Sequence, residues 1–481
     1  MIESKKNTSG KNPKLVIIDN YFPNVKSAFR VLEFNYYLEH LKNVEIYSTA
    51  FEDYNCSMKE YSKYYPENVN KITKLEQKES FKADLFYTVF LYNTYRHLRT
   101  FLEENTPFIF TLYPGGGFAL DDPESDRKLE LILRSDLLKK VIVTQKITKD
   151  YLLKKFHFDE EKIELIFGGV FLSKLYKENR ERLYFPKDKK VINICFVAFK
   201  YTAEGRDKGY DLFVEVAKKI HQTNKNVYFH VVGNFDNSDI DVSVIKENIK
   251  FHGQLVTDEF VDFYKTMDII LSPTRPFVIT PGSFDGFPTG ACVEAGLNGV
   301  AVFTSDPLKQ NYLFKDGAEI VIVNDNVDDI VKKVKHYIFN QIGLGKISIK
   351  GEKKFRELFD TKKQMVPRLS LIEKYLSEKV VMSPREKKFA DLKRENLIME
   401  VDLFEKEKEI DQKNVLIKNQ EDNMANLILS LDETNGRLSA IYNSIPWRAY
   451  SNTKKVIQKA LPPDFRTRAI AKKIYKRTLK K

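Results

Sequence analysis

The sequence predicts an α/β protein with two Rossmann-like domains facing a cleft, followed by a long C-terminal coiled-coil helix and a basic tail. Three observations carry this prediction. Short β-rich runs alternate with helical patterns in two successive series, a heptad repeat follows them, and basic residues gather at the end. At 481 residues and 42% apolar content, the chain is long enough for two packed cores and an appendage.

The first series falls in residues 1–170 and has the rhythm of a parallel sheet. A helix is expected at 28–41, and further helical patterns separate the β-rich runs. The expected strands are 15–18, 44–47, 85–90, 108–112 and 141–144.

The second series falls in residues 171–345 and repeats the pattern. Strands are expected at 191–199, 227–232, 268–271 and 300–303, with helices at 210–220, 258–266 and 290–297. Ligands of open parallel sheets lie outside the carboxyl ends of the strands. We therefore expect the site in the loops after these strands and in the cleft between the domains, with residues 346–384 as a helical crossover and linker.

The segment from Pro281 to Glu294 is the strongest candidate for a site. Its glycines and prolines form a turn that opens directly into a helix, so backbone N–H groups and a helix N-terminus can hold an anion. Glu294 interrupts an apolar helical run and can accept hydrogen bonds from ribose or sugar hydroxyls. The alternative is that Glu294 and Asn298 are only the wet stripe of a half-buried helix.

Cations surround this segment. Lys200, Arg206 and Lys208 lie in the loop after the first strand of the second domain, and Arg275 follows the strand 268–271. Fixed positive charges can stabilise the charge that grows on a departing diphosphate, without a metal. The alternative for each residue is an exposed side chain on a surface loop.

The second domain carries a series of short motifs in a fixed order. They are 208–213 (KGYDLF), 231–233 (VVG), 249–253 (IKFHG), 267–273 (MDIILSP), 285–290 (DGFPTG) and 294–296 (EAG). These motifs resemble those of retaining GT-B glycosyltransferases of the large family-four (group 1) type, with bacterial surface-polysaccharide enzymes as the nearest variants. The resemblance covers about residues 15–376, and it implies a nucleotide-diphosphate sugar as donor, a glycan or lipid-linked acceptor, and no cofactor or metal.

The resemblance also implies roles for individual residues. Glu294 matches the acid that holds the ribose, and Lys208 and Lys200 match the basic pair on the diphosphate. The family's second acid lies eight positions before the first, where this chain has Gly286; its carboxylate, Asp285, comes one residue earlier. The residues expected to bind the donor are Glu294, Gly286, Phe287, Pro288, Thr289, Arg206 and Arg275, with Lys208, Lys200 and Asp285 in catalysis.

The first domain is expected to hold the acceptor. Tyr113 stands where similar enzymes often carry a histidine, and Gly115, Gly116 and Gly117 let the backbone approach a ligand, unless they only form a tight turn. Asn24 and Arg30 follow the first strand and can shape the same pocket. No residue is singled out as catalytic base, because the resemblance implies that the departing phosphate deprotonates the acceptor.

Residues 386–445 carry the heptad repeat. Its a positions are apolar except for one Asn, while the d positions are polar in the middle, and this pattern favours a parallel two-stranded coiled coil through 389–445. The alternative is one amphipathic helix packed on its own domain. The a positions are Phe389, Asn396, Leu403, Ile410, Ile417, Met424, Leu431, Leu438 and Ile445.

The basic charge lies almost entirely in the tail, 446–481, which has twelve Lys or Arg against the single acid Asp464. A basic amphipathic helix at 465–479 would suit an anionic membrane surface. Nucleic acid is the rival partner, but no nucleic-acid-binding module is recognisable, so none is expected. Without a signal-like or membrane-spanning segment, the chain is expected to be cytoplasmic and peripheral on the inner face of the membrane.

The three cysteines have no metal-ligand spacing and are expected to be buried thiols. Two rival functions stay open. A nucleotide-sugar epimerase of the same fold would need no acceptor, and a catalytically lapsed scaffold would work only through the coiled coil and the tail.

Overall fold

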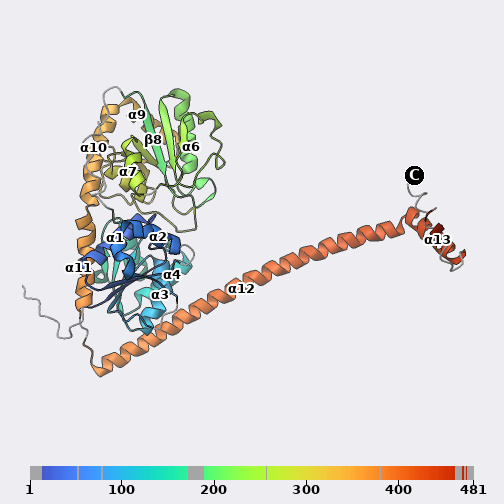
Figure 1. The fold of residues 1–481 in the computed structure, drawn as a ribbon, viewed down its shortest axis with the longest axis horizontal. Helices are drawn as coiled ribbons and strands as arrows, with labels where there is room; N and C mark the ends of the chain where they lie inside the picture. The colour runs from blue at the N-terminus through green and yellow to red at the C-terminus, as the bar shows by residue number, and fades with distance from the viewer. Residues whose placement is uncertain are drawn as a thin grey trace, which may run out of the picture. The chain divides into compact units, whose positions relative to one another are not determined.

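The computed structural model describes residues 13–50, 54–76, 80–171, 189–255, 257–378 and 381–460, together with residues 469, 470 and 473. Two parallel sheets, each flanked by helices, form the body of the protein (Figure 1). The prediction of two parallel α/β domains is therefore confirmed.

The first sheet has seven parallel strands in the order β3-β2-β1-β4-β5-β6-β7. Its central strands are fully buried, because apolar side chains face helices on both sides. The strands are β1 (Leu15–Asp19), β2 (Val44–Ser48), β3 (Ile72–Lys74), β4 (Leu85–Val89), β5 (Phe108–Leu112), β6 (Leu138–Val143) and β7 (Ile163–Leu165). The helices between them are α1 (Ala28–His40), α2 (Tyr54–Tyr64), α3 (Leu91–Glu103), α4 (Pro123–Leu133) and α5 (Lys146–Phe156).

The second sheet has six parallel strands in the order β10-β9-β8-β11-β12-β13. Its order also reverses at the first strand, which places the ends of β8 and β11 side by side at a switch point. The strands are β8 (Ile192–Val197), β9 (Val227–Val232), β10 (Ile249–Phe251), β11 (Ile269–Ser272), β12 (Ala301–Ser305) and β13 (Val321–Val323). The helices are α6 (Tyr210–Thr223), α7 (Thr257–Lys265), α8 (Gly290–Leu297) and α9 (Val327–Phe339).

The structure differs from the sequence prediction in a few elements. The strands β3, β7, β10 and β13 were not predicted; each has three residues, too few for a period to be recognised. The strand β6 begins at Leu138 rather than at residue 141, because Lys139 and Lys140 interrupt its apolar run. Of the cysteines, Cys195 and Cys292 are buried as expected, but Cys56 is exposed.

Two helices connect the domains along one side of the body (Figure 1). The helix α10 (Gln341–Leu358) packs on α8 and β12 of the second domain, whereas α11 (Thr361–Ser377) packs on α1 and β4 of the first. The side chains of Met365 and Ile372 are fully buried in the first domain's core. The crossover thus contributes to both cores.

The domains also meet through loops at the carboxyl ends of their sheets. The backbone N–H of Leu120 donates to the carbonyl oxygen of Gly282 over 2.9 Å. The rings of Phe118 and Phe284 pack edge to face with centroids 5.7 Å apart. Lys26 donates to Gln254 over 3.1 Å. The loops predicted to hold the site are therefore in contact across the domain boundary.

The C-terminal region is helical, with α12 at Pro384–Asn443 and α13 at Ile445–Ala460. The chain divides after Val401 into two units. Within the first unit, α12 packs on the N-terminal domain through buried Leu397 and Val401, and Glu400 pairs with Arg134 over 2.6 Å. These residues lie outside the a and d positions of the heptad.

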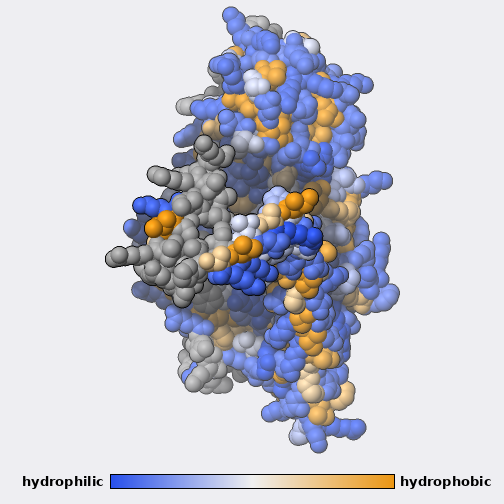
Figure 2. Space-filling view, turned by 90° about the vertical axis from the view of Figure 1, so that its right-hand side faces the viewer, coloured by the Kyte–Doolittle hydropathy of each residue, from blue (hydrophilic) through white to orange (hydrophobic). Residues whose placement is uncertain are grey.

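The apolar a positions of α12 stay exposed, with fractions such as 60% for Phe389 and 57% for Leu403. Figure 2 shows apolar residues in a band along the surface of this helix. The long helix is confirmed, and its pairing as a coiled coil stays a prediction. The predicted helix at 465–479 lies outside the described residues except for 469, 470 and 473. Among the described helices, none is both long and apolar enough to cross a membrane.

Candidate functional site

The candidate site is built around the loop that joins β11 to α8. Thr289 is the residue before α8 and has extended backbone angles, and the helix begins at Gly290. The first N–H groups of a helix have no partner inside it, so they are available to an anion. Beneath them, the hydroxyl of Thr289 lies 3.4 Å from that of Ser272 at the end of β11.

Buried side chains fix this loop on the domain. Phe287 is 3% exposed and packs in the core with Cys292 and Val293 of α8. The peptide bond between Phe287 and Pro288 is cis. Burial raises the pKa of the Cys292 thiol, so this side chain is a packing group rather than a thiolate.

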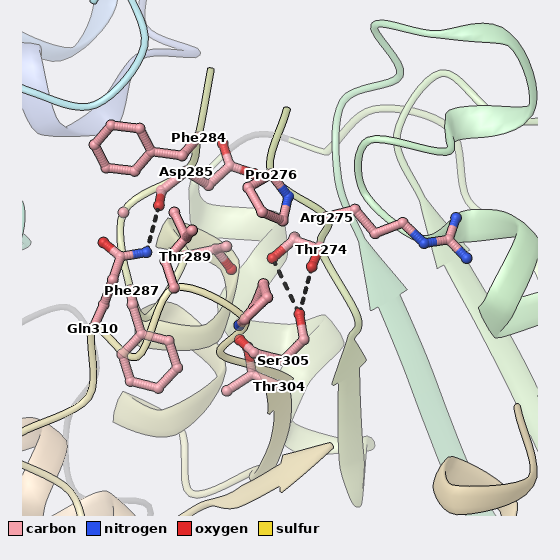
Figure 3. A pocket seen from close by; sticks show the side chains of 13 residues that line it. Thr274, Arg275, Pro276, Phe284, Asp285, Phe287, Thr289, Thr304, Ser305 and Gln310 are labelled. Atoms are coloured by element: carbon pink, nitrogen blue, oxygen red, sulfur yellow. Dashed lines mark hydrogen bonds between the residues drawn. The ribbon is translucent and has the colours of Figure 1, made fainter. Parts of the chain in front are cut away.

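The loop forms one wall of a pocket of about 330 Å³, open volume at its mouth included, at the carboxyl ends of β11 and β12 (Figure 3). The side-chain amide of Gln310 donates to the carbonyl oxygen of Asp285 over 3.1 Å. On the opposite side, the Ser305 hydroxyl donates to the carbonyl oxygen of Thr274 over 2.6 Å. The lining residues are Thr274, Arg275, Pro276, Phe284, Asp285, Gly286, Phe287, Thr289, Thr304, Ser305, Pro307, Leu308 and Gln310.

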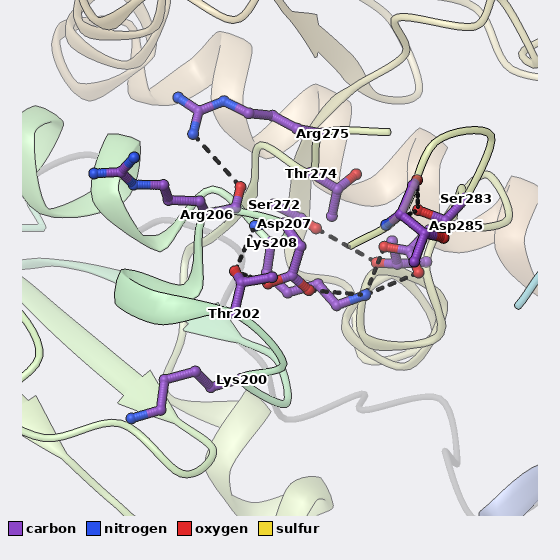
Figure 4. Close-up of polar contacts among 12 residues, drawn as sticks. Lys200, Thr202, Arg206, Asp207, Lys208, Ser272, Thr274, Arg275, Ser283 and Asp285 are labelled. Atoms are coloured by element: carbon purple, nitrogen blue, oxygen red, sulfur yellow. Dashed lines mark hydrogen bonds and ion pairs between the residues drawn. The ribbon is translucent and has the colours of Figure 1, made fainter. Parts of the chain in front are cut away.

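An ion pair joins this loop to the loop after β8. The Nζ atom of Lys208 lies 2.8 and 2.7 Å from the two carboxylate oxygens of Asp285 (Figure 4). The following residue, Gly209, has φ +74° and directly precedes α6, and a Cβ there would lie 2.1 Å from the carbonyl oxygen of Pro273. A glycine at 209 thus allows the start of α6 to approach the backbone of Pro273, and the neighbouring Lys208 then reaches Asp285.

The other three predicted cations point away from Asp285 (Figure 4). The ammonium group of Lys200 pairs with Asp239, and the guanidinium group of Arg206 pairs with Glu204. Arg275 lines the pocket, but its guanidinium group bonds Asp211 at 2.8 Å and Asp325 at 2.9 Å.

Neighbouring carboxylates therefore neutralise the positive charges of these three side chains. Burial alone would lower the pKa of Arg275, but Asp211 and Asp325 raise it. Of the four predicted cations, the structure brings Lys208 to the site, and the expected cluster of Lys200, Arg206 and Arg275 around the loop is not formed in it.

Glu294 lies in the second turn of α8 and is half-buried. Its supposed partner on a wet stripe, Asn298, is 5% exposed. The side-chain amide of Asn298 donates to the carbonyl oxygen of Glu294 over 2.9 Å and so caps the end of the helix. The two residues therefore do not form an exposed polar stripe.

Position 286 faces the first domain. A Cβ at Gly286 would lie 2.9 Å from the amide nitrogen of Gln145 and 3.6 Å from the ring of Pro114. Gln145 follows β6 and is 3% exposed, so it occupies the space that a side chain at 286 would enter. A side chain at 286 would therefore have to displace the end of the Gln145 side chain.

The predicted residue Tyr113 turns into the core of the first domain. Its hydroxyl donates to Glu33 over 3.2 Å, and Glu33 also accepts a hydrogen bond from Tyr37 over 3.1 Å. Arg368 of α11 lies 3.7 Å from the same carboxylate, and both charged side chains are fully buried. Burial and the Glu33 charge raise the pKa of Tyr113. Tyr113 therefore anchors the crossover helix, and its hydroxyl is not presented to an acceptor.

The three glycines have positive φ angles of 79°, 56° and 88°. Gly116 packs on the Phe90 ring and Gly117 on Tyr92, whereas Gly115 has open space where a Cβ would stand. Two of the three thus serve close packing, and Gly115 is the one placed to let a ligand approach.

The remaining predicted residues of the first domain hold the loop after β1. The side-chain oxygen of Asn24 accepts a hydrogen bond from the backbone N–H of Lys26 over 3.0 Å. Arg30 pairs with buried Asp19 over 3.1 Å, and its guanidinium group lies 4.7 Å from the centre of the Phe90 ring. Both residues shape this loop, and Arg30 brings it against the glycine segment.

Comparisons with known proteins place Lys208, Asp285 and Glu294 in a family segment. Residues 192–340 match the model of the family "Glycosyl transferases group 1". No curated protein sequence is significantly similar to the chain.

Solved structures match over most of the chain. A glycosyltransferase from Rickettsia africae is 15% identical, with a TM-score of 0.56, covering 77% of this chain and all of that one. Sucrose-phosphate synthase from Thermosynechococcus elongatus is 12% identical, with a TM-score of 0.54 and coverage of 75% and 98%. HepE from Anabaena, solved in complex with UDP-glucose, is 14% identical, with a TM-score of 0.54 and coverage of 74% and 99%. The chain has the GT-B glycosyltransferase fold.

Within this GT-B fold, two glutamines were missed by sequence reasoning. Gln310 gives no signal in the sequence, because its position depends on the turn after β12. Gln145 directly follows the predicted strand 141–144, so the rule for carboxyl ends of strands could have found it.

In the part of the chain that the structure describes, no group of three or more His, Cys, Asp or Glu side chains is placed to hold a metal ion.

Proposed function

We propose that the protein is a glycosyltransferase that moves a sugar from a nucleotide-diphosphate donor to a glycan or lipid-linked acceptor with retention of configuration. One observation carries the proposal. Lys208, the N-terminus of α8 and the loop 284–289 come together at the switch point of the second GT-B domain, inside the segment that matches the group 1 family. A diphosphate needs such a combination of positive charge and backbone N–H groups.

In this proposal, Glu294 accepts hydrogen bonds from the ribose hydroxyls and Lys208 neutralises the diphosphate. The backbone at Gly286 and Phe287 and the first turn of α8 approach the phosphates and the sugar, so no metal is required. Lys200, Arg206 and Arg275 would have to leave their acids to take part, which makes them secondary. The departing phosphate accepts the acceptor's proton on the same face of the sugar. A UDP sugar is a suitable first donor to test, since HepE was solved with UDP-glucose.

The acceptor would bind on the first domain near Gly115, Asn24 and Arg30. A role in bacterial surface-polysaccharide synthesis, with the chain held peripherally at the cytoplasmic membrane, is part of the proposal. The described helix α13 supports it, because 39% exposed Trp447 and 63% exposed Val456 lie among basic residues and the helix has no acid. Co-sedimentation with anionic phosphatidylserine vesicles, before and after deletion of 446–481, tests this part; unchanged binding contradicts it.

A parallel homodimer through 389–445 completes the proposal. The a positions of α12 are exposed while Leu397 and Val401, on a different face, pack on the protein's own domain. This separation of faces disfavours the alternative of one helix packed through its heptad stripe. Light scattering of wild type and Leu403→Glu measures it: the wild type should be a dimer and the variant a monomer, and two equal masses would count against the dimer.

A thermal-shift panel of nucleotides and nucleotide sugars tests the enzyme function. The wild type should be stabilised by at least one nucleoside diphosphate, and Glu294→Ala should respond much less. Identical responses of the two proteins would show that the site is elsewhere. The epimerase and scaffold alternatives are not favoured. An epimerase would not need an acceptor-binding loop or a long C-terminal helix, and a catalytically lapsed scaffold would not need Lys208 and Glu294 at the site.

A further inference from the structure

Apart from Arg275 and Asp285, the polar residues that line the pocket beside the loop 284–289 are neutral. Hydroxyl groups of Thr274, Thr304 and Ser305 line it, and so does the amide of Gln310 (Figure 3). The one cation of the lining, Arg275, is bonded to Asp211 and Asp325. Such a lining suits hydroxyl groups of a ligand better than phosphates, which favour free positive charge.

The turn after β12 holds Gln310 in place. The Asp306 carboxylate accepts hydrogen bonds from the backbone N–H groups of Gln310 over 2.7 Å and of Asn311 over 2.9 Å. Lys309, which directly precedes Gln310 in this turn, has a φ of 52°. The backbone at 310 is therefore fixed by its neighbours, which leaves the side chain as the part that faces the pocket.

The side chain of Gln310 uses only one of its two polar ends. Its nitrogen donates to the carbonyl oxygen of Asp285, but its oxygen has no hydrogen-bond partner among the described residues. The residue is 9% exposed, so the free oxygen is nearly shielded from water. Buried acceptors are nearly always paired in folded proteins, and an unpaired one at a pocket is a place where a ligand's donor fits.

We infer that Gln310 is a specificity-determining residue that accepts a hydrogen bond from a hydroxyl group of the donor's sugar. The inference rests on the proposed function and adds to it the part of the donor that this pocket reads. Gln310 bonds the backbone carbonyl oxygen of Asp285 and Lys208 bonds its carboxylate, so sugar and diphosphate would be held next to one loop residue.

The test compares each nucleotide sugar with its own nucleotide. Calorimetric titration of the full chain with UDP, UDP-glucose, GDP and GDP-mannose gives the ratio of sugar-nucleotide Kd to nucleotide Kd. Gln310→Leu should raise this ratio about tenfold for the preferred donor, the loss of one hydrogen bond. Gln310→Glu, which keeps an acceptor oxygen, should leave the ratio within about threefold of wild type.

A matched control exists in the same domain. Gln341 also donates through its amide nitrogen, to the carbonyl oxygen of Lys189 over 2.9 Å, and its oxygen also has no partner among the described residues. Gln341 is the first residue of α10, and its partner Lys189 precedes β8 at the amino end of the sheet. Gln341→Leu should leave the ratio unchanged, and melting curves show whether each variant is folded.

Three outcomes would overturn the inference. Gln310→Leu could weaken nucleotide and nucleotide sugar by the same factor, or neither, or Gln310→Glu could raise the ratio as much as the Leu variant; in each case Gln310 only supports the loop. If wild type binds no nucleotide at all, the proposed function itself fails, and that result is distinct because it does not depend on Gln310.

Discussion

In the proposed function Lys208 neutralises the diphosphate of the donor, and in the structure Lys208 is paired with Asp285. A donor that binds to Lys208 must therefore compete with the Asp285 carboxylate, which also repels the phosphates. We expect Asp285→Asn to bind a nucleoside diphosphate more tightly than wild type, because the amide leaves Lys208 without a competing negative charge.

The magnitude follows from how buried the pair is. The Lys208 side chain is 13% exposed and that of Asp285 is 37% exposed. Exposed ion pairs contribute about 0.2–1 kcal/mol, and breaking a buried one costs about 3–5 kcal/mol. An intermediate cost of about 1–2 kcal/mol corresponds to roughly 5- to 30-fold in the Kd of the nucleotide.

Calorimetry with UDP and GDP, at low and at high salt, measures the effect, and salt should reduce it. The control is Asp268→Asn, since both carboxylate oxygens of Asp268 also contact one lysine, with the Nζ atom of Lys189 at 2.5 and 2.7 Å. Asp268 precedes β11, at the opposite edge of the sheet, so its variant should bind nucleotide as wild type does. An unchanged or weaker affinity in Asp285→Asn would refute the reasoning and would mean that the carboxylate itself holds the donor.

Three further predictions concern stability, each measured by thermal or denaturant unfolding of the full chain. Gly282→Ala should lower the free energy of unfolding by about 3 kcal/mol, because its Cβ would lie 2.0 Å from the carbonyl oxygen of Leu120 at a φ of +77°. Gly286→Ala should lower it by less than about 1 kcal/mol, since only a flexible side-chain end must move. Equal losses in the two variants would contradict this. Arg368→Leu should cost about 3–5 kcal/mol by leaving a buried carboxylate unpaired, and a loss below about 1 kcal/mol would show that the pair is dispensable. Burial lowers the pKa of His97 to about 4 in the folded protein, so between pH 6.5 and pH 4 the unfolded chain binds a proton on this imidazole that the folded chain does not. Up to about 3 kcal/mol of the free energy of unfolding is therefore lost as pH falls from 6.5 to 4. His97→Leu should remove this part of the dependence of stability on pH, and an identical pH profile of wild type and variant would disprove it.

Much of the fold could be predicted because its signals are local. The runs 108–112, 227–232 and 290–297 match β5, β9 and α8 residue for residue, since apolar runs and a glycine-rich turn define their ends. The short edge strands could not be predicted, because three residues such as those of β10 form a strand only by pairing with a neighbour.

The candidate site divides in the same way. The sequence determined by itself that a turn rich in glycine and proline opens into α8, that Glu294 follows, and that basic residues lie in the preceding loops. Only the tertiary structure decided which basic residue reaches the turn. Lys208 pairs with Asp285, 77 residues away in sequence, and Tyr113 donates to Glu33, 80 residues away. Such pairings depend on which loops the parallel sheets bring together, and a charge is satisfied by the nearest acid in space, which no local pattern records.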